Sequence, residues 1–435
     1  MIAADGARSP LDRAADALTL LTVFLLFGVS AMTLAAFGVA YDQAGGSFLQ
    51  KFHPSTYTAC LALAIRFLAR RNPLGWLAAQ TSRFPGATYF VATWVAMILF
   101  ASLVQRIPIS PIIDSFLCSV ALLVLYADAD EKTRAILRLA LHAFMFVNAC
   151  IGIGEFVTKT RLTPFVAGGK VILHDYRSTA LLGHPLINAG TAAAYALLLI
   201  WGADRAVGWM TRLLLIGVQG AALVTFGGRT AIVLCAALGG LRLIGPALQI
   251  LGGRRFDMRG ALLAALACPL LLLAVVLLVQ RGSFDGLAER FADDKGSADA
   301  RLLIFQLFDY FSLDELLFGP DQQRLNAIQN TLGIEYGIES SWFGFLFGYG
   351  VFMALFFGVA FAALMWEYWR RCRPGAWALF VYLLVQLTSS VGVSAKTLML
   401  SQFAVLLLAF FCDDRAPAPR PQRARDALRL EPGRA

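Results

Sequence analysis

Long apolar runs with few internal charges recur along this chain, and this pattern limits its possible folds more than any other feature. A helix that crosses the hydrocarbon core of a bilayer needs about 20 mostly apolar residues. Only 15% of the 435 residues are charged, against roughly 25% in an ordinary soluble domain. The sequence therefore predicts an all-α fold, a polytopic transmembrane helical bundle that forms one integrated membrane domain.

By the hydropathy criterion, about twelve segments approach or reach the length of a membrane span. They cover residues 17–40, 55–69, 86–105, 110–127, 135–158, 185–202, 207–226, 229–251, 260–280, 340–366, 375–392 and 397–412. Segment 55–69 is the weakest, because it is short and Arg66 near its end must reach an interface. We therefore expect about 12 transmembrane helices.

Basic residues alternate between the connections, which predicts the orientation of the bundle. The clusters in every second connection are Arg70, Arg71 and Arg83; Lys132, Arg134 and Arg138; Arg205 and Arg212; Arg254, Arg255 and Arg259; and Arg370, Arg371 and Arg373. Cytoplasmic loops carry an excess of Lys and Arg, so this face and both termini are expected in the cytoplasm. The net charge of +9 is interpreted as this orientation signal, with no nucleic acid as partner.

The expected organisation has five parts. They are a cytoplasmic N-terminus (1–16), transmembrane helices 1–9 (17–280), a large periplasmic loop containing short helices (281–339), transmembrane helices 10–12 (340–412) and a basic disordered cytoplasmic tail (413–435). Within the loop, Ser297-Ala298-Asp299 can cap an amphipathic helix that ends before Leu317-Phe318-Gly319-Pro320. The arginines of the tail suit acidic lipid headgroups.

The cysteines and the missing motifs exclude several kinds of chemistry. Seven cysteines lie inside or at the ends of apolar segments without a CxxC pair, so we expect no disulfide, no metal site and no cofactor. No P-loop, HExxH or GxSxG pattern is present. Nucleotide hydrolysis, zinc proteolysis and serine hydrolysis therefore lack residue support.

Three groups of polar residues lie on the predicted outer face, where the positive-inside rule disfavours cations. They are residues 174–179 with Gly183-His184-Pro185, the turn 227–230 (Gly-Gly-Arg-Thr), and residues 337–342. Arg177 and Arg229 are each either interfacial anchors or parts of an anion site. Two guanidinium groups that face one cavity would suit a diphosphate.

Glu339 and His184 each have two possible roles. Glu339 is either a helix N-terminal acid favoured by the helix dipole or a general base that takes a proton from a sugar hydroxyl. His184 is either a helix-start residue or a catalyst. Arg281, Arg290, Arg301 and Arg324 are solvated by default, although one can join a site, and Lys396 can assist an anionic ligand or mark the interface.

Residues 140–400 resemble, in motif order and hydropathy, the O-antigen ligase and Wzy-type polysaccharide polymerase family of the bacterial envelope. The resemblance rests on Tyr176-Arg177-Ser178 with Gly183-His184-Pro185, on residues 225–230, on Leu317-Phe318-Gly319-Pro320, and on residues 339–350. Where ligases of the family have a histidine, this chain has Glu339. This difference favours a polymerase or an exopolysaccharide relative over a ligase that acts on lipid A-core.

The resemblance implies a GT-C-like inner-membrane enzyme that needs no metal and extends glycans from a polyprenyl-diphosphate-linked oligosaccharide on the periplasmic face. The implied partners are this donor, a glycan acceptor, membrane lipids, a flippase and chain-length regulator proteins. The residues predicted to act are Glu339 and His184 in catalysis, and Arg177, Arg229, Tyr176, Arg301, Arg290, Lys396 and Trp342 in diphosphate or substrate binding.

Three other functions remain open from the sequence. A ligase would move a finished glycan onto a lipid or protein acceptor. A transporter or flippase of lipid-linked sugars would also have about twelve spans, although no broken-helix pair recurs in the two halves of the sequence. A structural membrane partner would need none of the outer-face arginines.

Overall fold

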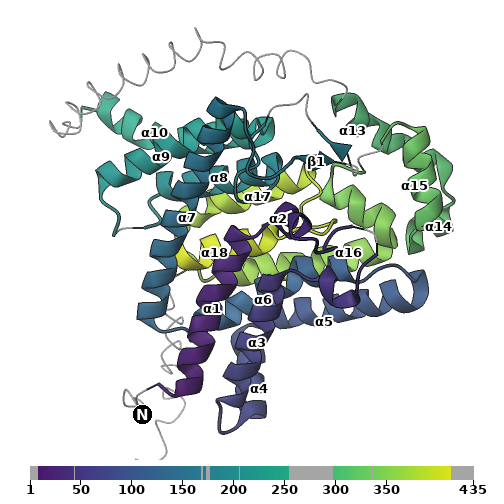
Figure 1. The fold of residues 1–435 in the computed structure, drawn as a ribbon, viewed down its shortest axis with the longest axis horizontal. Helices are drawn as coiled ribbons and strands as arrows, with labels where there is room; N and C mark the ends of the chain where they lie inside the picture. The colour runs from purple at the N-terminus through teal and green to yellow at the C-terminus, as the bar shows by residue number, and fades with distance from the viewer. Residues whose placement is uncertain are drawn as a thin grey trace, which may run out of the picture.

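The computed structural model describes residues 8–43, 45–167, 170–172, 177–204, 206–253, 297–334 and 337–412. In these ranges the regular secondary structure is helical apart from one hairpin of two-residue strands, β1 (Val166–Ala167) and β2 (Lys170–Val171). The all-α class is therefore confirmed. Figure 1 shows α17 and α18 among the other helices, with α13, α14 and α15 grouped at one edge.

The helices follow the apolar pattern closely. The first part of the chain forms α1 (Pro10–Gly28), α2 (Ala31–Ala36), η1 (Phe48–Lys51), α3 (Pro54–Leu68), α4 (Pro73–Arg83), α5 (Pro85–Leu99), η2 (Phe100–Gln105), α6 (Ser110–Asp128) and α7 (Glu131–Thr158). The remainder forms α8 (Pro185–Ile200), α9 (Trp209–Phe226), α10 (Arg229–Leu251), α13 (Ser297–Gln306), η3 (Leu307–Tyr310), α14 (Leu313–Phe318), α15 (Gln322–Thr331), α16 (Ser341–Trp369), η4 (Pro374–Ala376), α17 (Trp377–Thr388) and α18 (Met399–Phe410).

Five described helices are long and apolar enough to cross a membrane. They are Pro85–Gln105, Ser110–Asp128, Glu131–Thr158, Trp209–Phe226 and Ser341–Trp369. The predicted count of about twelve is not confirmed in the described residues, and the predicted span 260–280 lies outside them. One reason is length, because α8, α17 and α18 are apolar but shorter than a full span.

Helix α16 folds back on itself at Gly350. The backbone there has φ 83° and ψ 162°, which is not helical. The rings of Phe345 and Phe357 stack with centroids 4.3 Å apart, and those of Trp342 and Phe361 lie 6.2 Å apart. A straight helix would separate positions 342 and 361 by about 28 Å. Residues 341–349 (the short arm) therefore run antiparallel to residues 351–369 (the long arm).

The turn at Gly350 is packed against the end of α14. A Cβ atom at Gly350 would overlap the backbone of Gly319 and come within 2.5 Å of the Leu317 carbonyl oxygen. Gln105 Nε2 donates to the carbonyls of Phe318 and Gly348, at 3.4 and 3.1 Å. The predicted helix from Ser297 is confirmed, but it ends at Gln306, and η3 and α14 continue to the break at Gly319, where φ is 93°.

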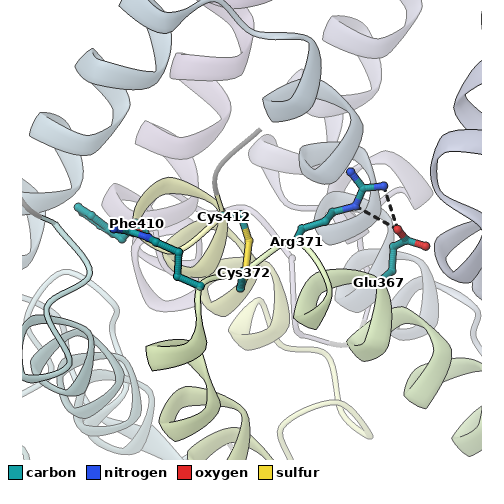
Figure 2. The surroundings of a disulfide bond; sticks show 6 residues. Glu367, Arg371, Cys372, Phe410 and Cys412 are labelled. Carbon is teal, nitrogen blue, oxygen red and sulfur yellow. Dashed lines mark hydrogen bonds and ion pairs between the residues drawn. A yellow bond between two sulfur atoms is a disulfide. The ribbon is translucent and has the colours of Figure 1, made fainter. Parts of the chain in front are cut away.

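The segment that contains α17 and α18 begins and ends at the same end of the bundle. Cys372 and Cys412 form a disulfide with Cα atoms 4.1 Å apart (Figure 2), so the prediction of no disulfide is wrong. The Arg373 N–H donates to the Phe411 carbonyl at 3.0 Å beside this bond. The two cysteines are 40 residues apart in the sequence, and their spacing does not reveal this pairing.

The irregular segment 389–398 between α17 and α18 meets the short arm. Ser341 Oγ donates to the Ser390 carbonyl at 2.8 Å and accepts from the Val393 N–H at 3.2 Å. The 12 residues of α17 rise only about 18 Å, against a hydrocarbon core about 30 Å thick. The hairpin formed by the two arms of α16 and the hairpin formed by α17 and α18 enter from opposite ends of the bundle. They therefore meet between those ends.

Most of the predicted basic connections gather at one end of the bundle, which we call the basic end. Asp128 accepts hydrogen bonds from Arg83 at 3.0 Å and from the Trp76 indole at 3.1 Å, and it pairs with Arg70 at 3.5 Å. Arg371 donates to the Arg83 carbonyl at 2.5 Å. This grouping agrees with the predicted alternation of the loops, while the side of the membrane on which it lies stays a prediction.

Gly350→Ala should destabilise the folded protein by about 1–3 kcal/mol or more, because the left-handed backbone disfavours a Cβ atom and this atom would strike α14. Gly348→Ala is the matched control, since a Cβ atom there meets nothing within 4 Å and alanine favours a helix by ~1 kcal/mol. Thermal unfolding of both variants in detergent measures the difference. Equal unfolding midpoints would contradict the fold-back at Gly350.

Candidate functional site

Charged side chains from separate segments of the chain influence Arg177. Burial and the guanidinium groups of Arg161 and Arg229 lower the pKa of Arg177 to about 10, while the Glu339 carboxylate acts in the opposite direction. A Coulombic effect weakens as the distance between the charges grows, so these charged groups lie near Arg177. The structure therefore brings Arg161, Arg177, Arg229 and Glu339 into one electrostatic neighbourhood, which we call the arginine site.

A direct backbone contact links the two segments that carry Arg177 and Arg229. The Ser178 N–H donates to the Thr225 carbonyl at 3.1 Å, near the end of α9. The chain then turns at Gly227 with φ 66° and enters α10 at Arg229. A Cβ atom on Gly228 would lie 2.5 Å from Ala189 of α8. The glycine pair therefore allows α10 to begin against α8, beside the Arg177 segment.

Three helical segments begin at or beside the residues of the site. Helix α8 starts at Pro185 after His184, α10 starts at Arg229, and the short arm starts at Ser341 after Glu339. The first turn of a helix has N–H groups without intrahelical partners and carries a partial positive charge. Together with three guanidinium groups, these helix starts favour an anionic ligand such as a phosphate.

His184 lies next to Arg177 as a neutral imidazole. Burial, and to a smaller extent the charge of Arg177, lowers its pKa to about 4. Its Nδ1 accepts the Leu186 N–H at 3.2 Å and caps α8, so the proton of the neutral ring belongs on Nε2. A group with this pKa is a weak base at neutral pH, and Nε2–H is suited to donate a hydrogen bond.

Arg161 and Phe165 belong to the same neighbourhood, although the sequence analysis did not select them. Arg161 donates to the Arg177 carbonyl at 2.9 Å and to the Ile172 carbonyl at 2.8 Å. Phe165 is buried and lies beneath both cations, 5.8 Å from the Arg161 guanidinium and 5.3 Å from that of Arg177. Arg161 also lies in a predicted outer loop, so the criterion that selected Arg177 could have selected Arg161 as well.

Two predicted site residues lie in other surroundings. Lys396 Nζ lies 3.6 Å from the ring centroid of Tyr41. Burial lowers the pKa of Lys396, and the carboxylates of Asp114 and Asp42 oppose this effect only in part. Trp342 packs on the short arm against Phe361 within the apolar core. Lys396 does not appear among the charges that act on Arg177.

Three further predicted residues are only partly described or not described. Tyr176 and Arg290 lie outside the described residues. Arg301 belongs to α13, and its side chain is not described. In the ranges that the structure covers, no three His, Cys, Asp or Glu side chains gather as a metal site.

No family model matches this chain, and no curated protein or solved structure matches it. The described structure is an all-α bundle with five helices long and apolar enough to cross a membrane, and Arg161, Arg177 and Arg229 share one neighbourhood in it. The resemblance to the polymerase and ligase family therefore continues to rest on the residues quoted above.

His184 should make the stability of the protein depend on pH between about 6.5 and 4. In this range the unfolded imidazole, with a pKa near 6.5, binds a proton that the folded ring with pKa about 4 does not. The free energy of unfolding therefore falls as the pH falls through this window. His184→Asn retains a helix-capping side chain and should show a shallower fall in unfolding midpoint. Identical pH profiles of the two proteins would contradict an imidazole that stays neutral in the folded protein.

Proposed function

We propose that this chain is a membrane glycosyltransferase, a polysaccharide polymerase that extends glycans from a polyprenyl-diphosphate-linked oligosaccharide. The observation that carries the proposal is the shared neighbourhood of Arg177, Arg229 and Glu339. Two cations and one carboxylate from distant parts of the chain are the groups that this transfer requires. The same three residues were selected from the sequence on independent grounds.

The guanidinium groups bind and stabilise the leaving group. Arg177 remains almost fully protonated at neutral pH, since its pKa is about 10. Forked N–H donors match the oxygens of a phosphate. Negative charge grows on the diphosphate as the glycosidic bond breaks, and fixed cations stabilise that charge where it develops. Nε2–H of His184 can donate to the same group or to a sugar oxygen.

Glu339 activates the acceptor. In the proposed step its carboxylate takes the proton of an acceptor hydroxyl, and the hydroxyl oxygen forms a bond to the anomeric carbon of the donor. The bond between this carbon and the diphosphate oxygen breaks, and polyprenyl diphosphate leaves with the electron pair. The side chain of Glu339 is half-buried, between the buried residues Ile338 and Ser340. It is therefore accessible to a ligand and also partly shielded from water.

The depth of the site also supports a lipid-linked substrate. The short arm and segment 389–398 meet inside the bundle. Backbone that is not helical at membrane depth is tolerated where it is buried in protein or lines a water-filled cavity. Residues of segment 389–398 are partly exposed, as such a cavity lining requires. A diphosphate whose polyprenyl tail stays in the bilayer can reach such a position.

Location and partners follow from the same proposal. The protein belongs in the bacterial inner membrane with both termini in the cytoplasm and the arginine site facing the periplasm. Its partners are the lipid-linked donor, a glycan acceptor and membrane lipids, with a flippase and chain-length regulators acting before or beside it. A ligase differs from this polymerase only in the acceptor.

One feature of the structure favours a second candidate, a transporter or flippase of lipid-linked sugars. Helix α16 is broken at Gly350, and α10 and the short arm begin at or beside residues of the arginine site. Secondary transporters bind anionic substrates at such broken helices near the bilayer midplane. The carboxylate beside two arginines has a defined role in glycosyl transfer and none in simple anion transport.

Glu339→Gln should reduce chain elongation at least about 100-fold, since general base catalysis contributes that much or more. Arg229→Gln should cause a loss of about 100-fold or more, because it removes a group that stabilises developing charge. The assay incubates purified protein with lipid-linked oligosaccharides and measures glycan length on gels. Arg138→Gln is the control, since Arg138 pairs with Glu131 near the basic end, and it should retain full elongation.

Two results would contradict the polymerase. Full elongation by Glu339→Gln would exclude the carboxylate as the base. Movement of lipid-linked sugars between the leaflets of proteoliposomes without any change in chain length would support the transporter.

A further inference from the structure

Glu155 is a buried carboxylate of α7 that the proposed chemistry does not use. Its side chain accepts hydrogen bonds from three backbone N–H groups, those of Leu162 at 2.6 Å, Thr179 at 2.7 Å and Ala180 at 3.0 Å. Glu155 itself is only 5% exposed. A buried carboxylate that accepts several N–H bonds fixes the backbone around it, because each donor would otherwise lack a partner.

These donors come from both ends of one loop. Leu162 follows the exit of the chain from α7, while Thr179 and Ala180 lie where the chain returns before α8. Arg177 lies two residues before Thr179. Ser178, between them, donates its N–H to Thr225 of α9 and its hydroxyl to the Gly152 carbonyl of α7 at 2.6 Å. Glu155 thus anchors the loop next to the contact that joins it to the Arg229 turn.

The anchored backbone adopts a conformation that needs such support. Ala180 is fully buried and has φ 38°, a left-handed conformation that costs a non-glycine residue free energy. Neighbouring amides hold the same stretch, since Asn148 accepts the Leu181 N–H at 3.0 Å and Asn188 donates to the His184 carbonyl at 3.0 Å. Strained backbone that is held in this way is typical of functional sites.

We infer that Glu155 is a positioning residue, which sets the place of the Arg177 guanidinium relative to that of Arg229 by holding the backbone of residues 178–180. This inference rests on the proposed function, in which the two guanidinium groups bind one diphosphate. Glu155 does not touch the ligand. Its effect on ligand binding passes through the loop.

The test compares Glu155→Gln with Glu367→Gln. A glutamine at position 155 keeps the size of the side chain but turns an NH2 group toward backbone N–H donors. Glu367 is an equally buried carboxylate, 1% exposed, which accepts the Gly86 N–H at 2.9 Å and pairs with Arg371 at the basic end (Figure 2). Both changes remove one buried charge, so both should lower the unfolding midpoint, but only one is next to the arginine site.

Two measurements are made on each purified full-length variant. Hydrogen exchange should be faster at residues 178–181 in Glu155→Gln and unchanged there in Glu367→Gln. The dissociation constant for inorganic pyrophosphate should rise about tenfold or more in Glu155→Gln, because a displaced Arg177 weakens a charge-assisted hydrogen bond to the ligand. Binding by Glu367→Gln should match that of the unmodified protein.

Each outcome decides one question. Unchanged exchange at residues 178–181 in Glu155→Gln overturns the positioning role, whatever the ligand result. Faster exchange with unchanged pyrophosphate affinity also overturns it, because the carboxylate is then a structural support alone. If the unmodified protein does not bind pyrophosphate, the diphosphate function fails, while faster exchange in Glu155→Gln still supports control of the Arg177 backbone by Glu155.

Discussion

The constraint on which the rest of the structure depends is the pairing of backbone polar groups where the chain leaves a helix inside the bundle. In hydrocarbon, each N–H and C=O group must find its partner within the protein. Buried side chains provide these partners here, with Glu155 and Asn148 serving the segment before α8 and Ser341 serving segment 389–398. The backbone held in this way lies two residues from Arg177, at Thr179, and the Ser341 that holds segment 389–398 lies two residues from Glu339.

The local elements of the fold were predictable, whereas their lengths and folding back were not. Apolar runs gave most of the helices, and the helix predicted near Ser297 is present as α13. The reversal at Gly350 depends on ring contacts such as Phe345 with Phe357, which an apolar run cannot reveal. The disulfide was missed for a related reason, because backbone pairing between the ends of two helices brings Cys372 and Cys412 together.

Charge placement was the useful signal for the site. Arg177, Arg229 and Glu339 were selected as charges on the predicted outer face, and the structure places them in one neighbourhood. The same signal did not separate Lys396, which faces Tyr41, from the arginine site. It also passed over Arg161, since an arginine that supports another residue's backbone does not differ in sequence from a solvated one. Long-range contacts decide between these two environments.

The hairpin of α17 and α18 has a consequence for mapping the topology of such proteins by experiment. A hairpin that enters and leaves through one face does not change the sidedness of any segment before or after it. A topology that counts α17 and α18 as two full crossings therefore places the two chain ends on the same sides of the membrane as a topology that counts no crossing for them. Reporter fusions at the termini are insensitive to this distinction, and only a probe within residues 389–398 would report that the chain turns before it reaches the far leaflet.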